Sequence, residues 1–172
     1  PELYQGISCI CNTSLTCLSS CPVKTFMNTT SINEHFTEDH ERLDELFHQF
    51  QTLKTSNRVK AVNDFMEFKS GLEKHIVWEE EILFPSFEKK FGHLGGPTEV
   101  MRWEHWEIRK YLNAIAAKLA QDDNDTDVEE MGLQSVLCPH NHKEESILYP
   151  MIDQVIGTEE RAGIFVRIGA GA

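Results

Sequence analysis

Apolar residues recur every three or four positions along most of the chain from residue 27 onward, which is the spacing of amphipathic α-helices. Polar or glycine-rich breaks interrupt this spacing at residues 55–57, 91–97 and 121–125. The segments between them predict four helices, over about residues 31–53, 58–84, 97–120 and 126–149. The pattern therefore predicts an all-α fold, an up-down-up-down four-helix bundle, with a short C-terminal helix that Thr158 could cap.

Several of the predicted helix ends carry signals of their own. Ser31 and Thr126 each precede a glutamate by three residues and so predict capping boxes, in which both side chains bond exposed backbone amides. Pro85 is expected to disturb the end of the second helix, because proline lacks an amide proton and clashes with the preceding turn. Pro139 lies inside the fourth helix, where it predicts a local bend or, alternatively, a split into two helices.

The first 26 residues differ from the rest of the chain. They show no helical or strand periodicity, so we expect a poorly ordered extension followed by a bundle domain over residues 27–172. The extension contains four of the five cysteines, at spacings that do not match a usual zinc site: Cys9, Cys11, Cys17 and Cys21. Reduced thiols are the favoured interpretation, with a redox or metal-transfer segment and disulfide pairing as alternatives.

Charge and hydropathy narrow the possible partners. The formal net charge of −12 argues against nucleic acid and anionic membranes, because both require basic patches on the protein. No apolar run approaches the roughly 20 residues that span a bilayer. We also find no basic-then-apolar leader and therefore expect a cytoplasmic protein, whose oligomeric state the sequence leaves open.

A repeat of metal-ligating residue types is the main chemical feature of the chain. In each copy two histidines lie 35 residues apart and a glutamate follows the second histidine after four more. The copies are related by a shift of 65 residues and consist of His40, His75 and Glu79, and of His105, His140 and Glu144. Self-similarity at a fixed shift indicates duplicated supersecondary units. Each unit carries two imidazoles and a carboxylate, which predicts half of a dinuclear metal site.

Helix geometry can bring these six side chains together. Residues four apart lie on the same helix face, so the second histidine and the glutamate of each copy can converge on one ion. The midpoint between the two histidines of each copy falls at a predicted turn, which places them level on antiparallel helices. All six lie on apolar stripes, where unpaired imidazoles and carboxylates would cost several kcal/mol each. A buried polar network without metal is the alternative.

Positions one helical turn before and after the first histidine of each copy also correspond at the shift of 65 residues. Phe36 and Met101 each lie one turn before the first histidine of a copy, where core packing is the favoured role and a wall beside an open coordination position the alternative. Asp44 and Arg109 each lie one turn after it, and we expect a cross-bundle ion pair rather than a catalytic role.

The remaining polar residues near the repeat are expected to lie outside the cluster. Glu80, Glu81 and Glu145 are expected to face solvent, although Glu80 and Glu145 also repeat and could support the ligands. The other histidines are expected to be solvent-facing or structural, off the ligand face, in a loop or too far along the helix: His35, His48, His93 and His142.

The pattern His, His-x3-Glu, His, His-x3-Glu, with Glu-Glu-x-Ile-Leu-Phe/Tyr-Pro, resembles the hemerythrin-like, or HHE cation-binding, family of four-helix bundles over about residues 31–156. The resemblance implies a non-haem di-iron centre with an oxo or hydroxo bridge. One iron would be bound by His40 and His75, and the other by His105 and His140. The bridging carboxylates would be Glu79 and Glu144.

The sequence also departs from classical hemerythrin, whose third helix supplies His-x3-His. Here Met101 and Arg109 flank His105, so a fifth histidine is missing, and Glu144 replaces the aspartate of the oxygen carriers. In this respect the ligand set resembles the iron–sulfur repair proteins and some bacterial peroxide-handling members of the family.

Several functions are compatible with such a site. A symmetric site, open on both metals, should suit peroxide or nitric oxide at least as well as dioxygen, and our leading hypothesis is a protein that binds or senses one of these. A peroxide-decomposing or iron–sulfur-repairing enzyme and an iron-responsive regulatory module are the alternatives, so enzymatic activity is left open. The same donors also accept zinc or manganese.

Overall fold

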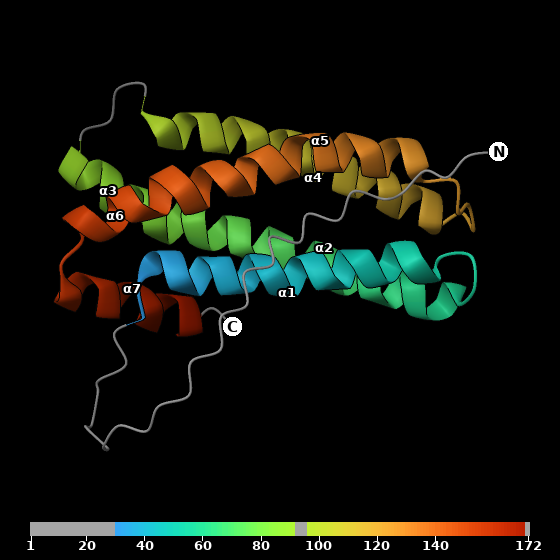
Figure 1. Ribbon diagram of the computed structural model, residues 1–172, viewed down its shortest axis with the longest axis horizontal. Coiled ribbons are helices and arrows are strands. Elements are labelled where there is room, and N and C mark those ends of the chain that lie inside the picture. Colours follow the sequence, from blue (N-terminus) through green and yellow to red (C-terminus); the bar gives the residue numbers. More distant parts are fainter. Residues whose placement is uncertain (1–29, 92–95, 171–172) are drawn as a thin grey trace, which may run out of the picture.

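The computed structural model describes residues 30–91 and 96–170, all of whose regular elements are helical (Figure 1). In chain order they are α1 (Ile32–Leu53), α2 (Arg58–Trp78), η1 (Glu79–Leu83), α3 (Phe84–Phe91), α4 (Pro97–Leu119), α5 (Asp127–Lys143), η2 (Glu144–Leu148), α6 (Tyr149–Val155) and α7 (Thr158–Ala170). The elements η1 and η2 are π-helical turns that join the α-helices on either side. The predicted all-α bundle with a short C-terminal helix is confirmed.

The helices form four columns along the long axis of the molecule, with α2, η1 and α3 making one column and α5, η2 and α6 another (Figure 1). The α1–α2 and α4–α5 connections lie at the same end of the bundle, and α7 lies at the opposite end near α3 and α6. The predicted extension over residues 1–26, its four cysteines and His93 lie outside the described residues.

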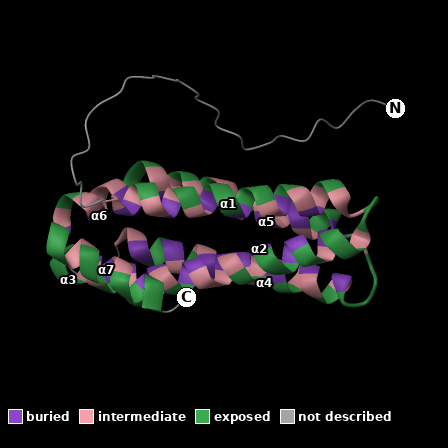
Figure 2. Ribbon diagram, turned by 90° about the horizontal axis from the view of Figure 1, so that it is seen from below, coloured by how far each residue is buried: buried purple, intermediate pink, exposed green. Residues whose placement is uncertain are grey.

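The apolar core is divided into two clusters. One lies toward the hairpin turns and includes Phe47, Phe65 and Leu112, and the other lies toward α7 and includes Ile32 and Ile152. Figure 2 shows that the buried positions follow the inward faces of the helices in both halves. The six repeated donors fall between the two clusters and are themselves buried. A polar layer therefore interrupts an otherwise apolar interior.

The two π-helical turns begin at the two glutamates of the repeat and are related by the same shift of 65 residues. The amide of Phe84 donates to the carbonyl of Glu79, and that of Tyr149 to the carbonyl of Glu144, each five residues back. In a regular α-helix, residues spaced four apart drift gradually around the helix axis. A π turn contains one extra residue and so keeps such residues facing the core. His75, Glu79 and Leu83 all remain buried in this way.

The π turns also explain why the predicted ends at Pro85 and after Tyr149 are wrong. Helical structure continues from η1 through Pro85 to Phe91, and from η2 through Pro150 to Val155. Proline normally lacks one helical bond and clashes with the carbonyl four residues back. For Pro85, the carbonyl four residues back is that of Glu81. It accepts a hydrogen bond from the Arg167 guanidinium at 3.2 Å instead. The irregular turn therefore absorbs the proline.

Two other helix predictions have different outcomes. The capping box at Ser31 is confirmed, since its hydroxyl accepts from the amide of Glu34 and the Glu34 side chain accepts from the amide of Ser31. The capping box at Thr126 is wrong, because its hydroxyl donates instead to the carboxylate of Glu130 at 2.5 Å. The alternative that Pro139 splits its helix is also wrong, since α5 continues through it.

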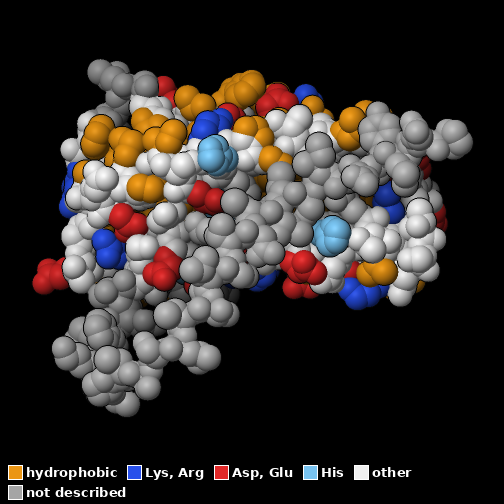
Figure 3. Space-filling model, viewed as in Figure 1, with side chains coloured by type: hydrophobic (Ala, Val, Ile, Leu, Met, Phe, Trp, Pro, Cys, Tyr) orange, Lys and Arg blue, Asp and Glu red, His pale blue; other side chains and the backbone are white. Residues whose placement is uncertain are grey.

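The surface is mixed in character. Figure 3 shows acidic, basic and apolar side chains interleaved on one face, with apolar groups gathered along the edge where α4 lies. Exposed apolar residues on α4 include Val100, Trp103 and Trp106. Within the described residues, no helix combines the length and the hydrophobicity needed to cross a membrane.

Packing between α4 and α5 yields a test of the fold. A Cβ atom at Gly132 would lie 2.3 Å from Cε1 of Tyr111, whereas one at Gly163 in α7 would meet nothing within 4 Å. Gly132→Ala should therefore lower the free energy of unfolding by about 1–3 kcal/mol, because the Tyr111 ring must move. Gly163→Ala should raise it by about 0.5–1 kcal/mol through helix propensity. Urea unfolding of both variants tests this, and equal effects would contradict the packing.

Candidate metal centre

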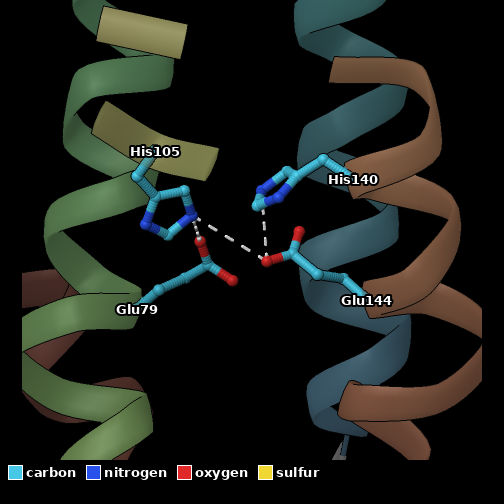
Figure 4. Close-up of side chains that lie close together, drawn as sticks. All are labelled: Glu79, His105, His140 and Glu144. Atoms are coloured by element: carbon cyan, nitrogen blue, oxygen red, sulfur yellow. Dashed lines mark ion pairs between the residues drawn. The ribbon is translucent and has the colours of Figure 1, made fainter. Parts of the chain in front are cut away.

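All six repeated donors lie in one buried layer. Each is supplied by a different element, and each side chain is at most 3% exposed: His40 on α1, His75 on α2, Glu79 on η1, His105 on α4, His140 on α5 and Glu144 on η2. Figure 4 shows four of them, from η1, α4, α5 and η2, pointing toward one another across the bundle. The geometry thus brings together every residue that the sequence singled out as a ligand.

The donor atoms form two groups. In the first, with all donor atoms within 4.8 Å of one another, are Glu79, His105, His140 and Glu144. His105 Nε2 lies 3.1 Å from Glu79 Oε2, and His140 Nε2 lies 3.3 Å from Glu144 Oε1. These separations suit neighbouring ligands of one ion.

The second group contains His40, His75 and Glu144 under the same distance limit. The two Nε2 atoms lie 3.1 Å apart, and His40 Nε2 lies 3.5 Å from Glu144 Oε2. Glu144 therefore faces both groups, and Glu79 also approaches the second, at 3.8 Å from His75 Nε2. Two positions that share carboxylates are the geometry expected of a dinuclear site.

Each of the four histidines bonds a carboxylate through its outer ring nitrogen. The Nδ1 distances run from 2.7 to 3.0 Å, for His40 to Glu145, His75 to Asp39, His105 to Glu80 and His140 to Glu104. Since a carboxylate accepts, we assign the proton to Nδ1 in each ring. Each Nε2 then carries a lone pair directed at the centre, as in metal-bound histidine.

Several inward-facing atoms of this cluster lack a hydrogen-bond partner. They are His105 Nε2, Glu79 Oε2 and Glu144 Oε1, all fully buried. The first two lie only 3.1 Å apart, but their alignment does not make a hydrogen bond. Lone pairs that face one another in a buried layer are compensated by a cation placed between them. The residues therefore fit a metal ion.

Three of the outer carboxylates, Asp39, Glu80 and Glu104, have lowered pKa values, which favours their ionised form. Burial alone would raise the pKa values of Asp39 and Glu80, but bonds with His75 and His105 and with nearby arginines lower both. The pKa of Glu104 is lowered by its bond with His140 and by Lys143. Ionised carboxylates make the histidines stronger donors to a cation.

The pKa values of the two central carboxylates shift in opposite directions. Burial and the charge of Glu79 raise the pKa of Glu144 well above its ordinary value. Burial acts in the same sense on Glu79, but His105 and the neighbouring imidazoles lower its pKa. One negative charge in place of two limits their repulsion in the metal-free protein.

The hydroxyl of Tyr149 lies between these two carboxylates, at 2.8 Å from Glu79 Oε1 and 3.0 Å from Glu144 Oε2. Burial and the two acidic groups raise the pKa of this phenol well above its ordinary value. Sequence reasoning missed this residue. Its equivalent at the shift of 65 is Phe84, whose ring stacks on His105 at a centroid distance of 5.9 Å. The two halves of the site are therefore not alike.

The sequence interpretation was partly wrong about the surrounding acids. Glu80 and Glu145 do not face solvent but bond histidines of the opposite hairpin, as the alternative interpretation held. Asp39 and Glu104, which bond the histidine of their own hairpin, were missed. Both pairs are related by the shift of 65, so the repeat itself contained the signal.

The residues one turn from His40 and His105 have distinct environments. Phe36 and Met101 are buried in the cluster near α7, as expected for core packing. Arg109 does form an ion pair across the bundle, but with Glu80 at 3.2 Å. Asp44 is exposed and is not its partner, so the expected pairing of Asp44 with Arg109 is wrong.

The remaining histidines stay outside the cluster. His48 and His142 are exposed, and half-buried His35 packs against the rings of Phe36 and Phe165. Within the part of the chain that the structure describes, the groups able to hold an ion all consist of the six repeated donors.

Comparison with known proteins agrees with this geometry. Residues 31–152 match the family model of the hemerythrin HHE cation binding domain. An uncharacterised hemerythrin-like protein of Schizosaccharomyces pombe is 26% identical over 133 residues, which are 76% of this chain and 64% of the yeast protein. The chain thus spans less than two thirds of that relative's length. No solved structure matches.

Burial of His140 makes the metal-free protein sensitive to acid. Burial lowers the pKa of His140 to about 4, so the folded protein holds fewer protons here than the unfolded chain as the pH falls from about 6.5. Stability is therefore lost over that window. His140→Gln should reduce the loss by up to about 3 kcal/mol. Urea unfolding with chelator at pH 4 to 7 measures it, with exposed His48→Gln as the control, and parallel curves for wild type and His140→Gln would contradict the burial effect.

Burial of the Glu144 carboxyl, whose pKa is raised, should oppose folding in the absence of metal. Glu144→Gln removes a buried acid whose folded pKa is raised, so it should stabilise the metal-free protein by about 1–3 kcal/mol. The gain should be larger at pH 8 than at pH 5, because the cost of keeping Glu144 protonated grows as the pH rises above its ordinary pKa. Chelator-treated samples unfolded in urea at both pH values test this, and a destabilised variant would refute it.

Proposed function

Since this chain belongs to the family of the hemerythrin HHE cation binding domain, we propose that its six buried donors form a dinuclear iron site that binds or senses dioxygen, nitric oxide or peroxide. In this proposal His40 and His75 hold one iron, and His105 and His140 hold the other. Glu79 and Glu144 span the two positions. Bound iron would supply a redox-active centre with coordination positions open to a small ligand.

The observation that carries the proposal is the direction of the four histidine rings. With the proton assigned to Nδ1, every ring donates a hydrogen bond to an outer carboxylate and directs its Nε2 lone pair toward the two central glutamates. A purely structural network would use N–H groups to satisfy the buried oxygens. Instead Glu79 Oε2 and Glu144 Oε1 have no hydrogen-bond partner. Divalent ions bind neutral imidazole and ionised carboxylate, so an ion at the centre would use these lone pairs.

The apolar surroundings of the cluster support a small ligand. The six donors are buried, and apolar side chains such as Phe36 and Met101 pack on the side toward α7. Leu43 and Leu72 belong to the cluster on the other side. A small uncharged ligand can enter such a layer at low cost, whereas a large or highly charged one would have to displace the core.

Metal analysis tests the site directly. Protein from iron-supplied cells should contain about two irons per chain, the expected occupancy of a site with two positions. Glu79→Ala and Glu144→Ala should each abolish the iron pair. Glu144 belongs to both donor groups, and Glu79 Oε2 lies 3.1 Å from His105 Nε2 and 3.8 Å from His75 Nε2. Glu81 is an exposed glutamate in the π turn that contains Glu79, and Glu81→Ala should retain the iron pair. Zinc or manganese in place of iron would refute the iron assignment, and no bound metal would refute the site.

Ligand mixing then separates the functional classes. The diferrous protein should bind dioxygen or nitric oxide reversibly, with a spectrum that returns when the ligand is removed. Sustained peroxide decomposition would instead favour the enzyme. Partner binding or thermal melting that depends on iron, without ligand binding, would favour the regulatory module.

A further inference from the structure

The duplicated halves differ at the residue that follows each π turn, where Tyr149 corresponds to Phe84. We propose that the Tyr149 oxygen is a seventh protein donor and serves only the position formed by His40 and His75. The position formed by His105 and His140 then keeps the coordination site that an external ligand occupies. This inference rests on the proposed dinuclear function and assigns each position its own role.

The hydroxyl is placed as a ligand of the His40–His75 position would be. It lies 3.3 Å from His75 Nε2, 3.5 Å from His40 Nε2 and 3.0 Å from Glu144 Oε2. The two Nε2 atoms lie 3.1 Å apart. Bonds of about 2.0–2.2 Å to one ion place adjacent donors about 3.0–3.5 Å from one another. The four atoms thus have the mutual spacing of one coordination shell.

The other position has no such donor. Phe84 lies at the equivalent place, with its ring parallel to His105 within 5°. The described donors there are His105, His140, Glu79 and Glu144. Both glutamates also approach the other position, where Glu144 belongs to the donor group and Glu79 Oε2 lies 3.8 Å from His75 Nε2. A phenyl ring can cover an imidazole but cannot bind an ion, so this position has one fewer oxygen.

The charges around the acids that bond the histidines also differ between the two positions. Glu80, behind His105, is bonded by Arg109. Within the described residues Glu145, behind His40, has no lysine or arginine partner, and the place equivalent to Arg109 is held by Asp44. The His40–His75 side is therefore the more negative. A cation is bound more tightly where the donors are more numerous and the field more negative.

Tyr149→Phe tests the assignment, because it removes only the oxygen, and Tyr111→Phe on α4 is the matched tyrosine control. Diferric wild type and Tyr111→Phe should show a visible phenolate-to-iron charge-transfer band with tyrosinate ring modes in resonance Raman. Tyr149→Phe should lack both. Deuterated tyrosine in the wild type identifies the ring modes without any variant, so the test survives a variant that does not fold.

Two further measurements do not depend on this band. Anaerobic titration of the metal-free protein with Co2+ should show that Tyr149→Phe weakens the tighter binding step by at least about tenfold, the lower range for residues that merely support a ligand. Nitric oxide should bind the diferrous wild type at one position and the variant at both.

The outcomes separate this inference from the proposed function. Two irons per chain without tyrosinate modes, with equal Co2+ affinities in wild type and Tyr149→Phe, would overturn the inference and leave the dinuclear site standing. The hydroxyl would then only donate to the carboxylates. Failure of wild type and Tyr111→Phe to bind a metal pair would overturn both.

Discussion

The bond from each histidine Nδ1 to an outer carboxylate is the interaction on which the site depends. It fixes the proton on the outer nitrogen and leaves the inner nitrogen as a lone-pair donor, which a free imidazole would not do reliably. Asp39 and Glu104 bond histidines of their own hairpin, whereas Glu80 and Glu145 bond across to the other hairpin. The same four bonds therefore orient the ligands and join the two halves of the bundle.

A buried polar layer of this kind destabilises the folded state. Imidazoles and carboxylates interrupt the apolar core between two hydrophobic clusters, and their desolvation opposes folding unless a cation lies among them. The protein limits this cost by confining the polar layer and by raising the pKa of Glu144, which favours its neutral form. A cation bound in this layer would therefore stabilise the folded protein, as in other proteins whose ligands are buried.

Duplication explains the architecture, and divergence explains its asymmetry. The π turns, the prolines after them and the outer acids all recur at the shift of 65 residues, so both halves present donors in the same way. Two of the differences at the site are Tyr149 against Phe84 and Asp44 against Arg109. The first difference changes the oxygen donors, and the second changes the electrostatic field around a metal position. Neither changes the backbone of the repeat.

The sequence by itself determined the all-α class, the turns and the cap at Ser31, because helical periodicity is a local signal. Its duplicated motif also singled out the six residues that the structure brings into one buried layer. The sequence mispredicted the helix ends at Pro85 and Tyr149, since only packing shows that a π turn absorbs a proline. Tertiary structure alone decided which acid meets which histidine and where Tyr149 points. Those pairings join residues from different helices, and their distances depend on how four columns pack, which no spacing along the chain encodes.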